Sequence, residues 1–219
     1  NNLYSVVVRL EVGLPLKCSK YLITLINSFH MDHEIGQLYH IYNRGNNQGL
    51  IFFTDENYKY FIRKIIKYIK PSVDILSFCL MPNHFHLLIH IPENYVHSKF
   101  SNQLRTCLTS YTRAINIQEK RTGSLFQQHT KSKQLELENG NSDLAFICFN
   151  YIHQNPLKAK LVIKMENWLY SSFNHFLNND SSVVNIKLAQ DLINLPDDRN
   201  LFYKETYESI EEELFNELF

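Results

Sequence analysis

The sequence predicts an α+β fold: an antiparallel sheet with helices on one face, followed by a helical, acidic C-terminal extension. Three observations support this. Short runs rich in β-branched and aromatic residues recur between turn residues, which indicates strands. Two of these runs flank a tight turn, which indicates an antiparallel hairpin. Longer segments with apolar residues at every third or fourth position separate the runs, which indicates amphipathic helices.

The first half of the chain predicts three strands and one helix. "LYHIYNRGNN" (38–47) alternates until its Asn-Arg-Gly turn and is interpreted as a strand. Residues 55–70 have helical spacing and stop at Pro71, which cannot continue a helix. Residues 72–80 and 84–91 are two further strands joined by a Met-Pro-Asn turn.

The second half predicts two more helices and one strand. Residues 98–120 read as a helix with a basic face, and residues 121–137 as a loop and a short strand. A third helix over 141–156 is capped by Asn141 or Ser142 and ends at Pro156. The order of these elements predicts a ferredoxin-like, RRM-like sheet.

The charge distribution divides the chain into three parts. Residues 31–177 form the expected domain and carry 16 Lys and Arg against 11 Asp and Glu, which permits a polyanionic partner without requiring one. Residues 178–219 carry 3 against 10 and are expected to be a loosely packed, acidic helical tail. Residues 1–30 are interpreted as an upstream segment outside the native domain, with Met31 as the natural start. No apolar run reaches the roughly 18 residues that cross a bilayer.

"MPNHFHLLIH" places two histidines in an otherwise apolar strand. His84 and His86 are two positions apart, so they share a face of the strand and can bind one divalent metal. The alternative is two half-buried, hydrogen-bonded histidines without a metal. A metal site would need a third ligand.

The helix over 141–156 can supply that ligand. Tyr151 and Asn155 are four positions apart and so are neighbours on one helical face. The Asn155 amide offers an oxygen to a metal, and the Tyr151 phenol can attack phosphorus and form a covalent intermediate. The alternative is that Tyr151 belongs to the apolar stripe of this helix and is a core aromatic.

Taken together, these motifs resemble those of a known family. The stretches "YHIYNRGN", "FCLMPNHFHLLI", "RTGSLFQQHTKSK", "YIHQNPLKAKLV" and "WLYSSF" occur in the order found in single-tyrosine HUH transposases, over about residues 36–173. More narrowly, they resemble the REP-associated tyrosine transposases, which are similar to insertion-sequence transposases. Two positions depart from common relatives: Asn155 replaces a Gln, and His129-Thr130 replaces an Arg-Phe before Lys131.

The resemblance implies metal-dependent cleavage and rejoining of single-stranded DNA next to hairpins, through a 5′-phosphotyrosine at Tyr151. It implies His84, His86 and Asn155 as ligands of Mg²⁺ or Mn²⁺, and a monomer or homodimer in a bacterial-type cytoplasm, associated with the nucleoid. Hairpin recognition is expected to rest on the basic helix faces. The residues expected to contact DNA phosphates are His40, Arg44, Lys131, Lys158 and Lys160.

Three other functions fit parts of the sequence. The main alternative is a catalytically silent DNA-hairpin-binding protein that acts as a repressor or architectural factor. A second is a ferredoxin-like RNA-binding module whose sheet aromatics stack on bases. A third is a hydrolytic metallonuclease, which would not need Tyr151. His90 and His153 are interpreted as structural or surface histidines.

Overall fold

The structure is a computed structural model that describes residues 33–135 and 143–208. All of these residues belong to one compact unit, His33–Phe219, which is distinct from residues Asn1–Asp32. The predicted upstream segment (1–30) and the predicted caps Asn141 and Ser142 lie outside the described residues.

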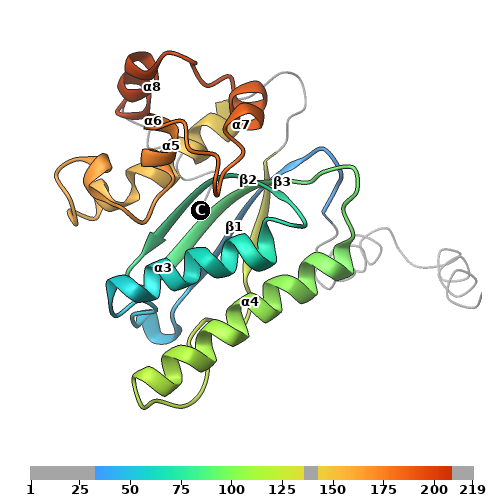
Figure 1. Cartoon of the computed structure of the whole chain (residues 1–219), viewed down its shortest axis with the longest axis vertical. Helices are drawn as coiled ribbons and strands as arrows, with labels where there is room; N and C mark the ends of the chain where they lie inside the picture. The colour runs from blue at the N-terminus through green and yellow to red at the C-terminus, as the bar shows by residue number, and fades with distance from the viewer. Residues whose placement is uncertain (1–32, 136–142, 209–219) are drawn as a thin grey trace, which may run out of the picture. The chain divides into compact units, whose positions relative to one another are not determined.

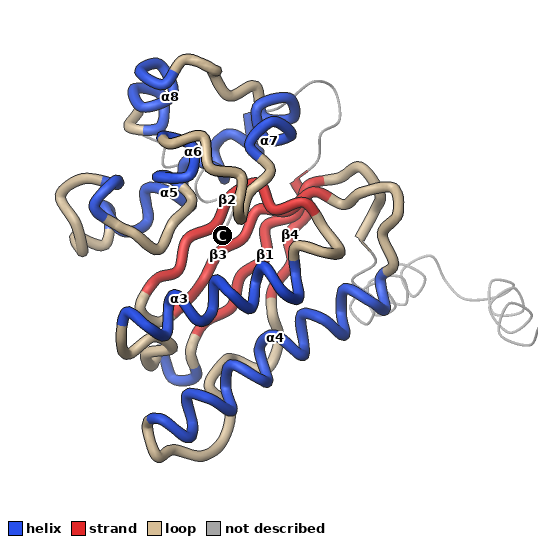
Figure 2. Tube along the Cα trace, viewed as in Figure 1, coloured by secondary structure: helices blue, strands red, loops and turns tan. Residues whose placement is uncertain are grey.

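Four antiparallel strands form the sheet (Figure 2). They are β1 (Leu38–Arg44), β2 (Asp74–Met81), β3 (His84–His90) and β4 (Lys131–Leu135), in the order β2-β3-β1-β4. The predicted hairpin is confirmed as β2 and β3, and β1 lies between β3 and β4. Because residues that face each other across paired strands share a face, this register decides which side chains meet.

The first face of the sheet is covered by α3 (Asp55–Lys64), its π-helical continuation η2 (Ile65–Ile69) and α4 (His97–Gln118) (Figure 1). A short 3-10 turn, η1 (Asn46–Gln48), precedes α3, and the Asn57 side chain accepts the backbone N–H of Thr54 at 3.1 Å at the start of the helix. Alternate strand residues point into this core. They include Tyr39 and Ile41 of β1, Phe78 and Leu80 of β2, and Phe85, Leu87 and Ile89 of β3.

The second face of the sheet is covered by α5 (Asp143–Lys158), which packs on β2 and β3. The strand residues in contact with this layer are those that alternate with the first set, such as Leu38, Cys79 and Leu88. The predicted arrangement with helices on one face therefore describes α3 and α4, whereas α5 lies on the other face. Sequence periodicity shows that a helix has an apolar stripe but not which side of a sheet it will cover.

Pro156 does not end α5 as predicted, because the helix runs on to Lys158. A proline removes the bond from its own N–H to the carbonyl four residues earlier, but its carbonyl and those beside it can still accept bonds from residues farther along the chain. The carbonyl of Asn155 accepts the N–H of Ala159 at 2.9 Å, and that of Pro156 accepts the N–H of Leu161 at 2.9 Å.

The described part of the C-terminal segment, residues 178–208, is helical, as predicted, but it is not loosely packed, and residues 209–219 lie outside the described residues. It contains α7 (Ile186–Ile193) and α8 (Arg199–Thr206), which follow η4 (Met165–Asn167) and α6 (Phe173–Leu177). Phe202 of α8 is buried and stacks on Phe176 with ring centroids 5.4 Å apart. These helices complete the hydrophobic core between α5 and the second face of the sheet. None of the helices in the described part of the chain has both the length and the apolar character needed to cross a bilayer.

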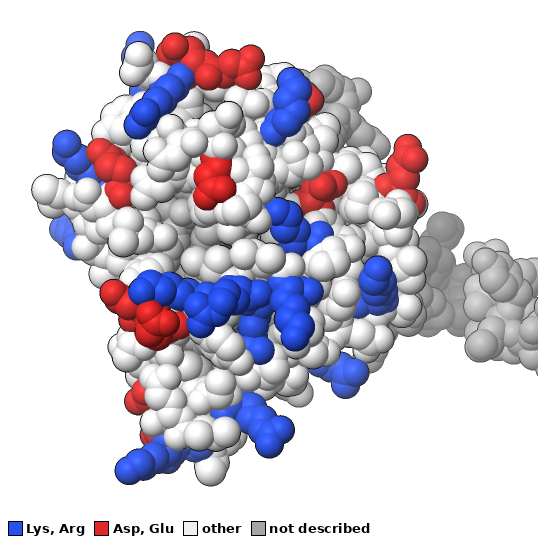
Figure 3. Space-filling model, in the orientation of Figure 1, with Lys and Arg blue, Asp and Glu red and all other residues white. Residues whose placement is uncertain are grey.

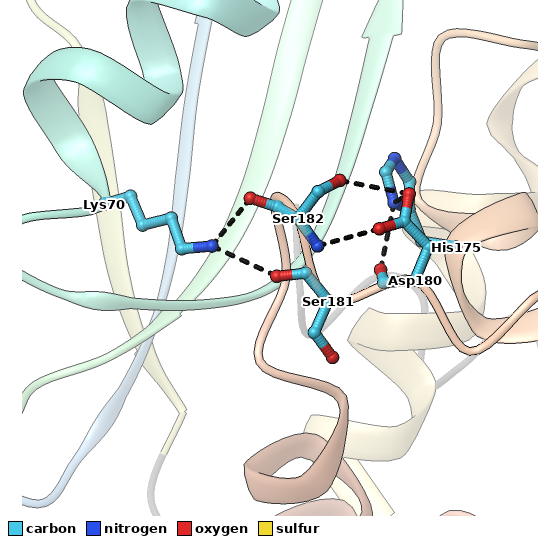
Figure 4. A network of polar contacts seen from close by, with 5 residues as sticks. All are labelled: Lys70, His175, Asp180, Ser181 and Ser182. Carbon is cyan, nitrogen blue, oxygen red and sulfur yellow. Dashed lines mark hydrogen bonds and ion pairs between the residues drawn. The ribbon is translucent and has the colours of Figure 1, made fainter.

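A polar network fastens the loop after α6 to the end of η2 (Figure 4). Lys70 Nζ donates to the carbonyl oxygens of Ser181 at 3.1 Å and Ser182 at 2.6 Å. The Asp180 carboxylate accepts the Ser182 N–H at 2.9 Å and pairs with His175 Nδ1 at 2.9 Å. The network therefore connects the C-terminal segment to the helical layer on the first face.

Candidate active site

The sheet register places the predicted site residues of β1 and β3 on the second face. Arg44 lies directly opposite His84, and Tyr42 lies opposite His86. Cross-strand partners project from the same side of a sheet, so all four side chains share the face that α5 covers. Phe85, the residue between the two histidines, points into the first core.

The edge strand β4 adds positive charge to this face. Lys131 lies opposite Tyr42, and Lys133 lies opposite His40. The sequence prediction named Lys131 but missed Lys133. The alternation of the two lysines in "KSK" was the signal that could have found it, because residues two apart on a strand share a face.

Helix α5 brings Tyr151 to the two histidines. The rings of Tyr151 and His86 have centroids 5.4 Å apart and are nearly perpendicular, at 82°. The rings of His84 and His86 are 5.0 Å apart. The helix is held in place by Cys148 and Ile152, which are fully buried against the sheet and direct Tyr151 to the edge of this core.

Asn155 joins the helix to the histidines. Its Nδ2 donates to the carbonyl oxygen of Tyr151 at 2.8 Å. Its side chain also interacts with the His84 imidazole and with the Tyr151 phenol, although burial is the larger influence on the pKa of both groups. The neighbouring amide of Gln154 points elsewhere, because it donates to the carbonyl oxygens of Thr206 and Glu208, both at 2.8 Å.

Burial sets the protonation of these groups. It lowers the pKa of His84 to about 4, with the nearby Arg44 as a second cause, and it holds the pKa of His86 well below its usual value. Both imidazoles are therefore neutral near pH 7 and keep a lone pair for a metal. Burial also raises the pKa of Tyr151 to about 12, so its phenol is protonated in the resting protein.

His40 has a different place from the one predicted. The sequence suggested a contact with DNA phosphate, but the side chain is fully buried. Its Nε2 lies 2.9 Å from Nδ1 of His86, and the two rings stack with centroids 5.0 Å apart. The prediction was wrong because the position of His40 depends on the pairing of β1 with β3, which the local sequence does not reveal.

The remaining basic residues lie at different distances from the site. Lys158 Nζ is 6.0 Å from the centroid of the Tyr151 ring, whereas Lys160 is exposed in the turn after α5.

Two further histidines lie outside the site. His153 is buried, and its Nε2 lies 2.6 Å from Ser172 Oγ, which fits the predicted structural role. His90 pairs with Asp74 at 3.2 Å.

The donor set fits a divalent metal. In residues 33–135 and 143–208, no three His, Cys, Asp or Glu side chains converge as a metal-binding group. The Asn155 side chain, which interacts with the His84 imidazole, offers an amide oxygen beside the two histidines. Two neutral imidazoles and one amide oxygen suit an ion that accepts both nitrogen and oxygen ligands.

Comparison with known proteins gives a consistent result. Residues 36–155 match the family model described as "Transposase IS200 like". A Haemophilus influenzae protein named as a REP-associated tyrosine transposase is 29% identical over 109 residues, which cover 46% of this chain and 58% of the relative. The match therefore spans a little over half the length of that relative.

A solved structure supports the fold. It is a REP-associated tyrosine transposase bound to a REP hairpin, and it superimposes with a TM-score of 0.53 at 19% identity. The match covers 72% of this chain and 88% of the other. The matched family segment runs from before β1 to Asn155 and makes up more than half of the sequence, so this chain belongs to the IS200-like transposase family.

Proposed function

We propose that this protein is a metal-dependent single-stranded DNA endonuclease and strand transferase that cleaves next to DNA hairpins. The observation that carries the proposal is the position of the Tyr151 ring beside His86, which in turn lies beside His84. Asn155 interacts with both Tyr151 and His84. A nucleophile next to a pair of metal-ligating groups is the arrangement that phosphoryl transfer needs.

In the proposed reaction, the phenol oxygen of Tyr151 attacks the scissile phosphorus. The bond from phosphorus to the 3′-oxygen breaks, the phenol loses its proton, and the departing 3′-oxygen gains one. The product is a 5′-phosphotyrosine, and attack by a 3′-hydroxyl reverses the step and rejoins DNA. This exchange keeps the phosphodiester energy, so it can move a strand without a further energy source.

His84, His86 and Asn155 would hold Mg²⁺ or Mn²⁺, which supplies Lewis-acid polarisation of the phosphate when bound. Asn155 has a second task, because its contact with the phenol orients Tyr151 relative to the histidines. Tyr151 is partly buried at the edge of the core on the second face of the sheet. Its pKa of about 12 also means that the phenol must lose its proton during the attack.

The cleaved strand would lie along the second face of the sheet. The proposed phosphate contacts there are Arg44, which is exposed opposite His84, Lys131 on the edge strand and Lys158 beside Tyr151. Lys160 would contact DNA farther from the site. Each neutralised phosphate adds affinity that falls with salt.

A separate basic surface runs along α3 and η2 on the first face. Figure 3 shows it as a continuous blue row across the middle of the molecule. Its exposed members are Lys59, Arg63, Lys67 and Lys70. We assign this row to the hairpin stem. Since the sheet separates it from Tyr151, stem binding and strand cleavage can be tested independently.

The test uses labelled single-stranded hairpin DNA from the flanks of the gene, with Mn²⁺ or Mg²⁺, resolved on a denaturing protein gel. Wild type is expected to give a covalent, metal-dependent protein–DNA band that Tyr151→Phe lacks. Tyr203→Phe removes a phenol from α8, away from both proposed DNA-binding surfaces, and is the matched control, so it is expected to retain the band. Cleavage that persists in Tyr151→Phe would indicate a hydrolytic nuclease. Binding without any cleavage would favour the silent DNA-hairpin-binding protein.

We also propose a domain over residues 31–177 followed by an extension over residues 178–219, a cytoplasmic location, and a monomeric or homodimeric state. The target sequence would follow from mapping cleavage sites with the same substrate.

A further inference from the structure

His40 and His86 form a buried pair of imidazoles on the second face of the sheet. His40 Nε2 and His86 Nδ1 are 2.9 Å apart, and both side chains are buried. His40 lies opposite Leu88 in the register, so it reaches His86 diagonally across the two strands. Tyr42 stacks on His40 with ring centroids 4.7 Å apart, which limits the rotation of the His40 ring.

This contact bears on the chemistry of His86. A neutral imidazole has one N–H group and one nitrogen with a lone pair. If His86 Nδ1–H donates to His40, then His86 Nε2 has the lone pair and can bind a metal. If His40 donates instead, His86 Nε2 carries the proton and cannot bind. The hydrogen bond therefore couples the tautomers of the two rings.

The geometry of the pair fits one shared proton. His40 Nε2 and His86 Nδ1 are 2.9 Å apart, which is a hydrogen-bond distance, so one ring donates and the other accepts. A neutral His40 can accept a hydrogen bond at Nε2 while its own proton sits on Nδ1. The nearly parallel rings, at 18°, also fix the plane of His86.

We propose that His40 is a positioning residue that holds His86 in its Nδ1–H tautomer and so presents His86 Nε2 as a metal ligand. The inference rests on the proposed metal site at His84, His86 and Asn155. A histidine that binds a metal through one ring nitrogen generally donates the N–H of the other to a carboxylate, a backbone carbonyl or a water. Loss of that partner typically weakens metal binding by about 10- to 100-fold. Here a second histidine fills that role.

The first test needs no metal and no substitution. Long-range ¹H–¹⁵N spectra of the metal-free wild-type protein are expected to show His86 protonated at Nδ1 and His40 protonated at Nδ1. A wild-type His86 protonated at Nε2 would overturn the inference. Because this measurement uses the native chain, it decides the question even where a variant fails to fold.

The second test uses variants. His40→Phe keeps a flat ring but removes the acceptor, so His86 is expected to lose its tautomer preference and Mn²⁺ binding to weaken by about 10- to 100-fold. His40→Gln restores an acceptor oxygen and is expected to recover part of both. His90→Phe is the control. It removes another histidine of β3, the strand that carries His86, and that histidine pairs with Asp74 instead of His40.

The outcomes separate the two proposals. If wild type fails to bind Mn²⁺, the proposed metal-dependent function fails, and the spectra still report whether His40 sets the tautomer of His86. If wild type binds Mn²⁺ but His40→Phe binds equally well with an unchanged His86 tautomer, the positioning role fails and the proposed function stands.

Discussion

The rings of Tyr151 and His86 lie 5.4 Å apart, although they come from helix α5 and strand β3, far apart in the sequence. The contact exists because α5 packs on β2 and β3, on the sheet face opposite α3 and α4. Under the proposed function, one phosphate placed beside these rings meets the nucleophile and the metal-binding histidines together.

Loss of the Asn155 amide is expected to weaken metal binding. Asn155→Ala removes the proposed third ligand. Loss of a residue that only hydrogen-bonds to a metal ligand typically weakens binding about tenfold or more, so loss of a ligand should weaken Mn²⁺ binding at least as much. Asn155→Asp keeps an oxygen and should retain binding. The control is Gln154→Ala, which loses contacts to Thr206 and Glu208 instead. Equal affinity in Asn155→Ala and wild type would remove Asn155 from the ligand set.

Arg44 and Lys131 are expected to neutralise phosphates of the cleaved strand. Replacing either with Ala should weaken binding of unstructured single-stranded DNA and reduce the slope of log K against log salt by about 0.7. Lys99→Ala, at an exposed position at the start of α4, should leave that slope unchanged. Unchanged slopes in Arg44→Ala and Lys131→Ala would place the cleaved strand elsewhere.

The basic row on α3 and η2 is expected to act on hairpins alone. Combined replacement of Lys59, Arg63 and Lys67 by Gln should reduce affinity for hairpin DNA and its salt slope while leaving unstructured single strands unaffected. Fluorescence anisotropy with both DNA types checks this. An equal loss for both would show a general electrostatic effect instead of stem recognition.

The C-terminal helices are expected to be part of the folded core. Phe202 is 4% exposed and stacks on Phe173 and Phe176, so Phe202→Ala should lower the free energy of unfolding by about 3–5 kcal/mol. The neighbouring Leu201 is 44% exposed, and Leu201→Ala should cost much less. Urea unfolding measures both. Equal small effects would mean that α8 contributes little to stability.

The buried His153 is expected to make stability depend on pH. Burial lowers its pKa from 6.5 in the unfolded chain to about 3 in the folded protein, so the unfolded state gains a proton first as the pH falls. Its stabilising contribution is present above about pH 6.5 and declines below that value. Between about pH 7.5 and 5.5, wild type should lose about 1.4 kcal/mol more than His153→Met. Parallel pH profiles for the two proteins would contradict this.

Local signals in the sequence predicted much of the fold. The β2–β3 hairpin follows from two alternating runs around a Pro-Asn turn, and α5 follows from its helical spacing. The grouping of Tyr151 with Asn155 needed only the helical repeat. The prediction that these residues meet His84 and His86 came from resemblance to a family, since no local pattern brings α5 to β3.

Contacts between segments far apart in the sequence determined the features that local sequence patterns did not predict. The side of the sheet that α5 covers, the bond between His40 and His86, and the packing of Phe202 all depend on contacts between distant segments. The end of α5 shows the same limit on a smaller scale, because the helix continues past Pro156 to Lys158, where the sequence predicted its end. Propensity describes a segment, and packing then selects its place.

Identification of the amino acid that carries the DNA would test the phosphotyrosine mechanism without relying on any variant. The covalent complex formed with hairpin DNA and Mn²⁺ would be digested with protease and nuclease and sequenced by mass spectrometry. We expect a nucleotide 5′-phosphate linked to Tyr151 in the α5 peptide. A nucleotide on another residue, or cleaved DNA with free 5′-phosphates and no linked peptide, would contradict it.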